Sequence, residues 1–451
     1  MARKFLSVLG NTNYNETIYK LKSTCKTRYI QEALTKDICN KWGKDDEIII
    51  FLTKEARTEN WYNTVDENRR LKEILELSHP NLKIKDVEIP FGKNEDEIWD
   101  IFNIMLANID EGDEVIFDIS NSFRSIPMLV LIILNYAKAL KNIQLKGIYY
   151  GAYEARTQEN GQTISPVFDL TPFDSLLEWS EAVSMFLKYG NSEKIRELST
   201  DKELIERVIK RDGAAIKIKN FVENLNDFTN NIYTCRGKMI TNGKSSCKKS
   251  IAKSYQMLKE NFESILEENN DLIKPLEPLF SKIDDRISEF SSDDNLKTGM
   301  SVIKWSIDNN LIQQGYTALD ETIKTYLCKR YGLDDSNNYD REKIINCALN
   351  IKKESNKEEY RNSCKNLKEL ITQIAINWNI KKDKEKIIQI AYKIDNKLIS
   401  LIDRIRDKRN DINHFGFNNS VSDYETMKNK LSKCYGEFKK YIEENSCDYK
   451  E

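Results

Sequence analysis

The fold of the first third of the chain is decided by one stretch, Glu114-Val115-Ile116-Phe117-Asp118-Ile119-Ser120-Asn121-Ser122-Phe123-Arg124-Ser125-Ile126-Pro127. An apolar, β-rich run leads into a short polar loop, and the loop opens a helical pattern. The same succession recurs through residues 1–172. Strands are predicted at Lys4–Leu9, Glu47–Leu52, Leu82–Ile89, Glu114–Ile119 and Gln144–Tyr150, with Tyr14–Lys20 as a candidate hairpin strand, and helices at Tyr29–Trp42, Asn60–Leu77, Glu95–Ile109 and Arg124–Lys141. This alternation predicts a Rossmann-like parallel sheet covered by helices on both faces.

Two polar loops follow the first and fourth predicted strands, which lie side by side in a Rossmann-type order with ligands bound beyond their carboxyl ends. The candidate ligand-binding residues are Gly10, Asn11, Thr12 and Asn13 in the first loop, and Asp118, Ser120, Asn121, Ser122, Phe123, Arg124 and Ser125 in the second. The second loop opens a helix whose free N–H groups favour an anion, and Arg124 can pair with it. A ligand with several phosphates and polar bases fits these loops. Alternatively, residues 120–122 only cap the helix.

From Asp174 onward the patterns are helical, so the fold class is α/β followed by all-α. One helical pattern near the C-terminus has Arg409 where its rhythm calls for an apolar residue, and His414 follows five residues later. Position 414 lies about 140° round a straight helix from 409. Either the helix breaks near residues 413–416, or two copies of the segment meet across an interface. In the simplest structural interpretation, Arg409 forms an interhelical ion pair and His414 is a helix-end residue.

The pairing of Arg409 with His414 restricts the chemistry. An arginine is never a base, but it holds a phosphate and stabilises charge as it builds. A histidine exchanges protons near neutral pH. Without metal ligands nearby, the pair suits phosphodiester cleavage by an internal nucleophile, which RNA carries as its 2′-OH. Four cations against one carboxylate, Asp407, within residues 404–409 add a local basic patch.

Composition narrows the remaining function classes. The 451 residues suffice for two or three domains, and the net charge of −2 provides no global basic field. Nine scattered cysteines without a CxxC pair indicate free thiols and no metal site. The chain has neither GxGxxG nor GxxxxGK[ST], so no dinucleotide cofactor and no P-loop is expected. The apolar runs are too short for a signal peptide or a membrane span, which predicts a soluble cytoplasmic protein. We expect His79 to be a surface turn residue and Glu321 to lie at the edge of a core.

Several segments of the first third resemble the CARF domain of CRISPR-associated type III accessory ribonucleases. They are Leu9–Tyr14, Thr27–Leu34, Ile89–Trp99, Asp118–Pro127 and Tyr149–Glu154. The family's Asp-x-Ser/Thr-His/Asn-Ser/Gly-Phe-Arg-Ser-x-Pro signature is matched from Asp118 to Pro127, with Asn121 where many relatives have histidine. The resemblance implies a sensor for cyclic oligoadenylate as allosteric activator, with one ring shared across a symmetric dimer.

The sequence Arg-Asn-Asp-Ile-Asn-His at residues 409–414 resembles the R-x4-H motif of HEPN ribonucleases, with Arg409 and His414 at its fixed positions and Asn410 at the polar second position. Residues 310–321 resemble a helix upstream of that motif in HEPN relatives. We therefore expect a CARF domain at 1–173, a helical connector at 174–300 and a HEPN domain at 301–451. The resemblance implies a homodimer or higher oligomer that cleaves single-stranded RNA without a metal, with Arg409, His414 and Asn410 as catalytic residues.

Two alternatives stay open. The chain could be a ring-binding signalling module whose helical part only recruits partners. The sensor could also cleave its own ring, with Thr12 and the amides of Asn11 and Asn13 as candidates. The size of the ring and the RNA sequence preference do not follow from the sequence.

Overall fold

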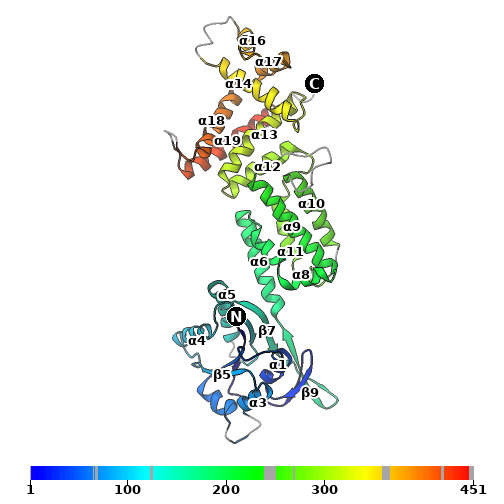
Figure 1. Ribbon diagram of the computed structural model, residues 1–451, viewed down its shortest axis with the longest axis vertical. Helices are drawn as coiled ribbons and strands as arrows, with labels where there is room; N and C mark the ends of the chain where they lie inside the picture. The colour runs from blue at the N-terminus through cyan, green and yellow to red at the C-terminus, as the bar shows by residue number, and fades with distance from the viewer. Residues whose placement is uncertain are drawn as a thin grey trace. The chain divides into compact units, whose positions relative to one another are not determined.

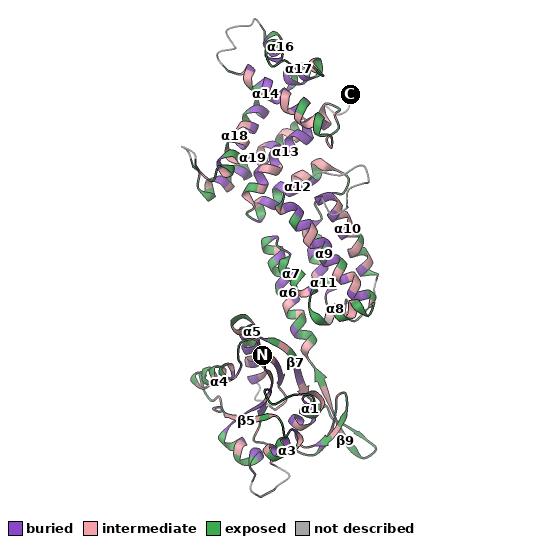
Figure 2. Cartoon of the chain, in the orientation of Figure 1, coloured by how far each residue is buried: buried purple, intermediate pink, exposed green. Residues whose placement is uncertain are grey.

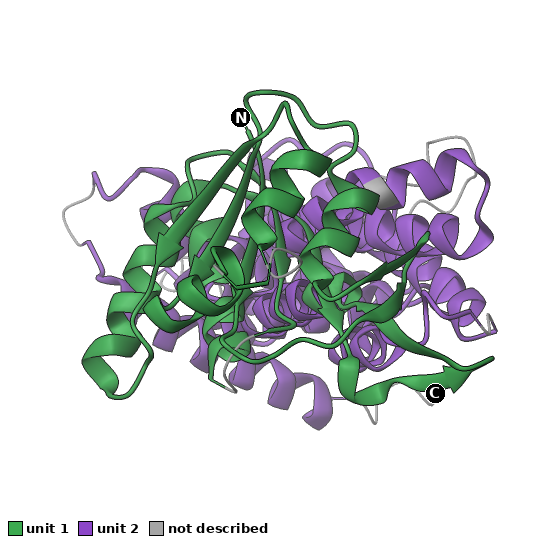
Figure 3. Cartoon of the chain, turned by 90° about the horizontal axis from the view of Figure 1, so that it is seen from below, with its two compact units in different colours: residues 1–175 green, residues 176–451 purple. Residues whose placement is uncertain are grey.

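The computed structural model describes residues 2–63, 65–66, 70–121, 125–237, 250–267, 270–357, 366–417 and 421–445. The chain divides into two compact units, Met1–Ser175 and Leu176–Glu451, which Figure 3 colours separately. The first unit is built on a sheet and the second is helical (Figure 1).

The first unit contains a mixed, mainly parallel sheet with the order β3-β2-β9-β7-β6-β1-β4-β5, and β8 pairs with β9. The strands are β1 Arg3–Leu9, β2 Thr17–Lys20, β3 Thr24–Thr27, β4 Glu47–Leu52, β5 Lys83–Glu88, β6 Glu114–Asp118, β7 Gln144–Gly151, β8 Thr157–Glu159 and β9 Gln162–Asp169. β1 pairs in parallel with both β4 and β6, so the first and fourth predicted strands are neighbours. The Rossmann-like order predicted from the sequence is confirmed.

Helices cover both faces of this sheet. They are α1 Ile30–Ile38, α2 Lys54–Ala56, the π-helix η1 Arg57–Trp61, α3 Leu71–Ser78, α4 Glu95–Ala107, α5 Ile126–Lys141 and the 3-10 helix η3 Tyr153–Ala155. Alternate residues of β1 enter two different apolar clusters: Phe5 and Leu9 pack on one face, and Leu6 and Val8 on the other. Burial on both faces explains why the parallel strands are nearly continuous apolar runs.

Three expectations for this unit need correction. The single helix predicted at Asn60–Leu77 is interrupted, because the side-chain oxygen of Asn63 accepts hydrogen bonds from the backbone N–H groups of Val65 and Asp66 and so competes with the helix. β9 was not predicted; it pairs antiparallel with β7 and parallel with β2, and its sequence has no long apolar run.

His79 ends α3 but is buried, with a relative exposure of 7%, since the chain turns back there toward β5. This burial lowers the pKa of His79.

The second unit consists of helices, with α6 beginning in the first. They are α6 Thr171–Tyr189, α7 Glu193–Ser199, α8 Lys202–Ile209, α9 Gly213–Tyr233, α10 Ile251–Leu266, α11 Glu277–Ile287, α12 Asn295–Asp308, α13 Ile312–Arg330, the π-helix η5 Asp340–Ile345, α14 Asn346–Ser355, α16 Leu367–Asn377, α17 Lys384–Lys393, α18 Asn396–Asn413 and α19 Tyr424–Glu444. Figure 2 shows buried stripes along these helices, as expected for amphipathic helices around a core. Among the described residues, none of the helices is both long and apolar enough to cross a membrane.

Two apolar clusters fill the second unit, and α12 contributes to both. Val302 and Trp305 pack into the cluster that includes Phe221 and Phe280, whereas Ile303 packs into the cluster of α13 to α19. A boundary near residue 300 between a connector and a HEPN domain stays a prediction.

Candidate functional site

The loop after β6 is organised by Asp118, which is fully buried at the end of that strand. Its carboxylate accepts hydrogen bonds from Ser7 Oγ at 2.7 Å and from the Ser120 backbone N–H at 3.0 Å, and it also bonds the Ser120 hydroxyl. The Ser120 Oγ in turn accepts a hydrogen bond from the Gly151 N–H at 2.7 Å. Burial raises the pKa of Asp118. Asp118 therefore holds the loop in place through buried hydrogen bonds and is not exposed itself.

The loop after β1 lies directly against the loop after β6. A Cβ added to Gly10 would lie 3.6 Å from the backbone oxygen of Asn121 and only 2.7 Å from Tyr14 Oη, so a side chain at position 10 would displace the Tyr14 hydroxyl. The Gly10 N–H donates to Tyr14 Oη at 2.9 Å. Asn11, Thr12 and Asn13 are exposed beside it. The sequence-predicted juxtaposition of the two loops is thus present.

The amide of Asn60 supports the first loop and was missed by the sequence analysis. Its Nδ2 donates to the backbone oxygens of Gly10 at 3.0 Å and Thr12 at 2.9 Å, while its Oδ1 accepts a hydrogen bond from Tyr29 Oη at 3.2 Å. Asn60 is fully buried. In the sequence, the signal for this supporting role was a polar asparagine directly before Trp61 in an apparently helical run.

The second loop is described only in part. The Nδ2 atom of Asn121 is buried and has no hydrogen-bond partner among the described residues. Ser125 is exposed and immediately precedes α5, where Pro127 occupies the first turn. Ser122, Phe123 and Arg124, which the sequence analysis selected for ligand binding, lie outside the described residues.

The second candidate site is at the C-terminal end of α18, in the second unit. The helix ends at Asn413, and His414 is its C-cap. Phe415 and Gly416 then adopt left-handed conformations, with φ of 54° and 72°. Of the two arrangements considered for Arg409 and His414, the described chain shows the break in the helix. The imidazole of His414 and the amide of Asn410 are both exposed.

Arg409 is held by a carboxylate from another helix. Its Nη1 donates to Asp320 Oδ2 of α13 at 2.8 Å, and the other oxygen of Asp320 accepts from Arg406 Nε at 3.0 Å. The side chain of Asp320 is 3% exposed and that of Arg409 is 33% exposed. The interhelical ion pair considered from the sequence is therefore present, and it leaves part of the guanidinium accessible. One carboxylate facing two guanidinium groups also leaves an excess of positive charge.

The basic patch expected at residues 404–409 is weaker than its sequence suggests, because other elements supply acids. Arg404 pairs with Glu437 of α19, and Lys408 lies 3.7 Å from the buried Asp411. Together with Asp320, these carboxylates neutralise most of the patch. The guanidinium of Arg409 stays partly accessible, and His414 is exposed.

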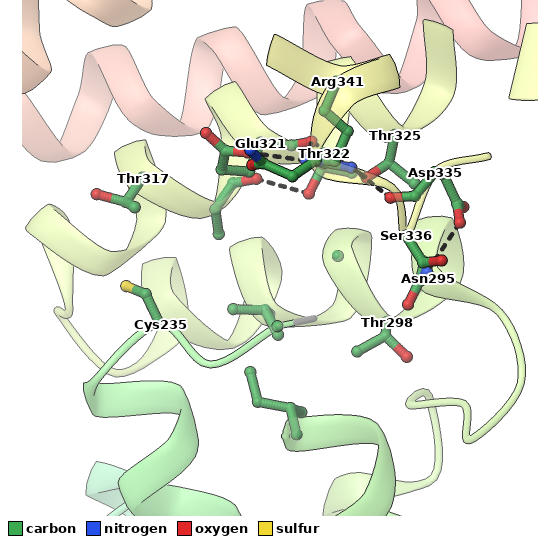
Figure 4. A pocket seen from close by; sticks show the side chains of 16 residues that line it. Cys235, Asn295, Thr298, Thr317, Glu321, Thr322, Thr325, Asp335, Ser336 and Arg341 are labelled. Carbon is green, nitrogen blue, oxygen red and sulfur yellow. Dashed lines mark hydrogen bonds and ion pairs between the residues drawn. The ribbon is translucent and has the colours of Figure 1, made fainter. Parts of the chain in front are cut away.

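A pocket of about 330 Å³ lies in the second unit, between α12, α13 and residues 335–338 (Figure 4). Burial raises the pKa of the Cys235 thiol in its wall, and the positive charge of Arg409 opposes this rise only weakly. Glu321, the residue after Asp320, lines the pocket and pairs with Arg341 and Lys324 at 2.8 and 2.9 Å. Burial acts to raise the pKa of Glu321, but these two cations outweigh it and lower the pKa. Glu321 is thus engaged at the edge of the core.

Comparison with known proteins assigns the first unit. Residues 4–154 match the family model described as CRISPR system endoribonuclease Csx1, CARF domain. The first unit contains a Csx1-type CARF domain. The CARF resemblance noted in the sequence is thereby confirmed. The match ends at residue 154, so the assignment of residues 301–451 as a HEPN domain stays a prediction.

Two further proteins are similar to this chain. Over 306 residues it is 29% identical to CRISPR-associated protein MJ1674 of Methanocaldococcus jannaschii, a match that covers 64% of this chain and 42% of that protein. The chain therefore spans less than half the length of that curated relative. Among solved structures, Enterococcus italicus Csm6 bound to cyclic hexa-2′-fluoro-hexa-dAMP matches with a TM-score of 0.46 and 10% identity, covering 100% of this chain and 96% of the other.

Proposed function

We propose that this protein is a cyclic-oligoadenylate-activated endoribonuclease of type III CRISPR antiviral defence that cleaves single-stranded RNA without a metal. The observation that carries the proposal is at the end of α18, where a buried carboxylate holds Arg409 by one nitrogen, close in sequence to the exposed His414. The CARF domain in the same chain supports the sensing half of the proposal, and the description of its family as a CRISPR system endoribonuclease supports the nuclease half.

The catalytic step needs one proton acceptor, one proton donor and a group that stabilises charge. His414 acts as general base toward the ribose 2′-OH or as general acid toward the leaving 5′-oxygen. The 2′-oxygen attacks the phosphorus, the bond to the 5′-oxygen breaks, and that oxygen takes up a proton. The products carry a 2′,3′-cyclic phosphate and a 5′-OH. The accessible N–H groups of Arg409 hold the phosphate and stabilise its extra negative charge. Asn410 is the further polar group at this site.

Asp320 is a positioning residue in this scheme. A guanidinium bound at one end by a fixed, buried carboxylate loses less freedom when it binds a phosphate with its other N–H groups. Arg406 shares the carboxylate and donates to Asn346 Oδ1 at 2.9 Å, so the arginine pair is anchored to two other helices. In an active dimer, two copies of this arrangement would face one groove.

The ring-binding surface would be formed by the loops after β1 and β6. The exposed Asn11, Thr12 and Asn13 offer amides and a hydroxyl, and the unpartnered Asn121 amide lies on the neighbouring loop. Asp118 and Asn60 contribute by fixing the two loops from below. Binding of the ring would then shift the population toward the arrangement of the helical domain that cleaves RNA.

An apolar stripe on α5 supports a homodimer. The helix that follows the β6 loop exposes large apolar side chains at helical spacing, at Met128, Leu131, Ile132, Tyr136 and Leu140. Contiguous apolar surface of this kind marks an interaction site. A second copy of the same stripe provides a self-complementary partner, and it would bring two ring-binding loops together about a two-fold axis.

Ile132→Glu is expected to weaken this dimer at least about tenfold, because it places an unpaired carboxylate within an apolar interface. Sedimentation velocity over a range of concentrations measures the effect. Ile209→Glu is the matched control, since Ile209 is an exposed isoleucine at the end of α8. Equal dimerisation of the two variants would show that the α5 stripe does not mediate self-association.

The proposed function is tested by incubating the purified protein with labelled single-stranded RNA in EDTA, alone and with cyclic tetra- or hexa-adenylate. We expect cleavage with one of the two rings and little cleavage without a ring. The products should carry a 2′,3′-cyclic phosphate, which end-group analysis by mass spectrometry detects. Ring binding without RNA cleavage at either ring size would contradict the proposal and favour a signalling module without nuclease activity.

A further inference from the structure

Two phenylalanines in the turn that follows His414 are almost fully exposed. Phe415 and Phe417 have relative exposures of 88% and 87%, and their rings lie nearly parallel, with an angle of 26° and centroids 6.4 Å apart. Such exposure leaves most of both aromatic side chains in water, where apolar surface is unfavourable. Burial in the described fold therefore does not account for an aromatic residue at either position.

The backbone does not account for Phe415 either. This residue is at the first position after the C-cap, with φ of 54°. Glycine is usual at that position and asparagine is the next choice, because a Cβ is unfavourable in the left-handed conformation. Gly416, the next residue, is also left-handed. A bulky aromatic residue is thus present where both solvent exposure and backbone conformation favour a different one.

The turn nevertheless presents the two rings in a defined way. The Phe415 N–H donates to the Ile412 oxygen at 3.0 Å, the Gly416 N–H to the Asp411 oxygen at 3.1 Å, and the Phe417 N–H to the His414 oxygen at 3.0 Å. These bonds complete a Schellman motif and satisfy carbonyls at the end of α18. The rings are consequently tied to the same helix end as the imidazole of His414.

We propose that Phe415 and Phe417 form a stacking platform for a base of the single-stranded RNA beside the bond that is cleaved. This inference rests on the proposed function and names how that substrate is held. Exposed aromatic rings beside cationic groups are the usual means of binding single-stranded RNA, since every base has a face that can stack. The accessible part of the Arg409 guanidinium, whose side chain is 33% exposed, provides the complementary contact to phosphate.

A second copy of the chain is a less suitable occupant of this surface. The patch consists of two rings on a turn, whereas α5 offers an apolar stripe along a whole helix for self-association. Stacking on a base also requires the aromatic face itself and not only apolar area. That difference provides the test.

The test measures the dissociation constant of a labelled single-stranded RNA by fluorescence anisotropy, in a His414→Ala background that leaves the RNA intact. Phe415→Asn and Phe417→Ala are each expected to raise it about tenfold, because loss of one stacked base costs about 1–3 kcal/mol. Phe415→Tyr and Phe417→Tyr keep the ring and should bind within about threefold of the parent.

Phe415→Asn should retain or raise the melting temperature, since asparagine suits the left-handed conformation. Phe173→Ala, at another exposed phenylalanine, is the control and should bind as the parent does.

Leucine variants separate RNA stacking from protein packing. Phe415→Leu and Phe417→Leu keep apolar volume but lack an aromatic face, so they should bind RNA as weakly as Phe415→Asn and Phe417→Ala do. If the leucine variants instead bind RNA and self-associate as the parent does, while the asparagine and alanine variants do neither, a second copy of the chain occupies this surface and the inference is overturned. RNA binding unchanged in Phe415→Asn and Phe417→Ala, with cleavage by the unsubstituted chain intact, would overturn the inference and leave the proposed function standing. Absence of RNA cleavage by the unsubstituted chain at both ring sizes would instead reject the proposed function itself.

Discussion

RNA cleavage by the activated protein is expected to fall about 10²–10⁴-fold when His414 is replaced by alanine, the range that a positioned general acid or base contributes. The imidazole is exposed at the C-cap of α18, so its loss removes proton transfer without opening a cavity in the core. The turn itself depends on backbone hydrogen bonds that alanine also forms. The measurement is the single-turnover rate on labelled RNA at saturating activator.

Asn413→Ala is the matched control for this variant, because Asn413 is an exposed neighbour on the same helix end. It should cleave within a few-fold of the parent. Both variants should bind the ring as the parent does and should melt at similar temperatures. Robust cleavage by a folded His414→Ala protein would remove the imidazole from the mechanism.

Arg409→Ala is expected to lower the rate constant of cleavage about 10²–10³-fold, as is typical when one preorganised group that stabilises developing charge is lost. Asp320 keeps Arg406 as a partner in this variant, so the carboxylate is not left unpaired in the core. Arg409→Lys should recover only part of the rate, because an ammonium group keeps the charge but not the planar set of N–H donors. The comparison is made on kcat and KM separately.

Two further substitutions sharpen the test of Arg409. Arg404→Ala removes a guanidinium from the same helix that is paired with Glu437, and it should change the rate by no more than a few-fold. Asp320→Asn should lower kcat more than it raises KM, because it leaves Arg409 in place but removes the charge that positions it. If Arg404→Ala and Arg409→Ala lower the rate constant of cleavage equally, the total positive charge of the helix matters and Arg409 has no specific role.

The sheet could be predicted from the sequence because the strands of a parallel sheet are buried on both faces. Arg3–Leu9, Glu47–Leu52 and Glu114–Asp118 are found within one residue of their predicted bounds. The polar loops after β1 and β6 could be placed together as well, since strand order and the carboxyl ends of parallel strands determine where such loops meet. β9 escaped prediction because it has no apolar run and because one of its partners, β2, is far away in sequence.

The candidate site of the second unit shows the limit of local pattern more clearly. The rhythm of α18 identified Arg409 as an unusual residue and His414 as a helix-end residue, and both observations depend only on neighbours in sequence. The partner of Arg409 lies 89 positions away, and nothing near residue 320 indicates that its carboxylate would be buried and shared by two guanidinium groups.

By itself, the sequence determined the five strands β1, β4, β5, β6 and β7, the polar loops of the CARF sheet and the two residues, Arg409 and His414, that define the proposed chemistry. Only the tertiary structure decided that Asp320 holds Arg409 by one nitrogen, that acids from other helices neutralise most of the basic patch, and that Phe415 is exposed in a left-handed turn. The physical reason is that periodicity and propensity act between neighbours along the chain. Ion pairing and burial depend on residues that only folding brings together.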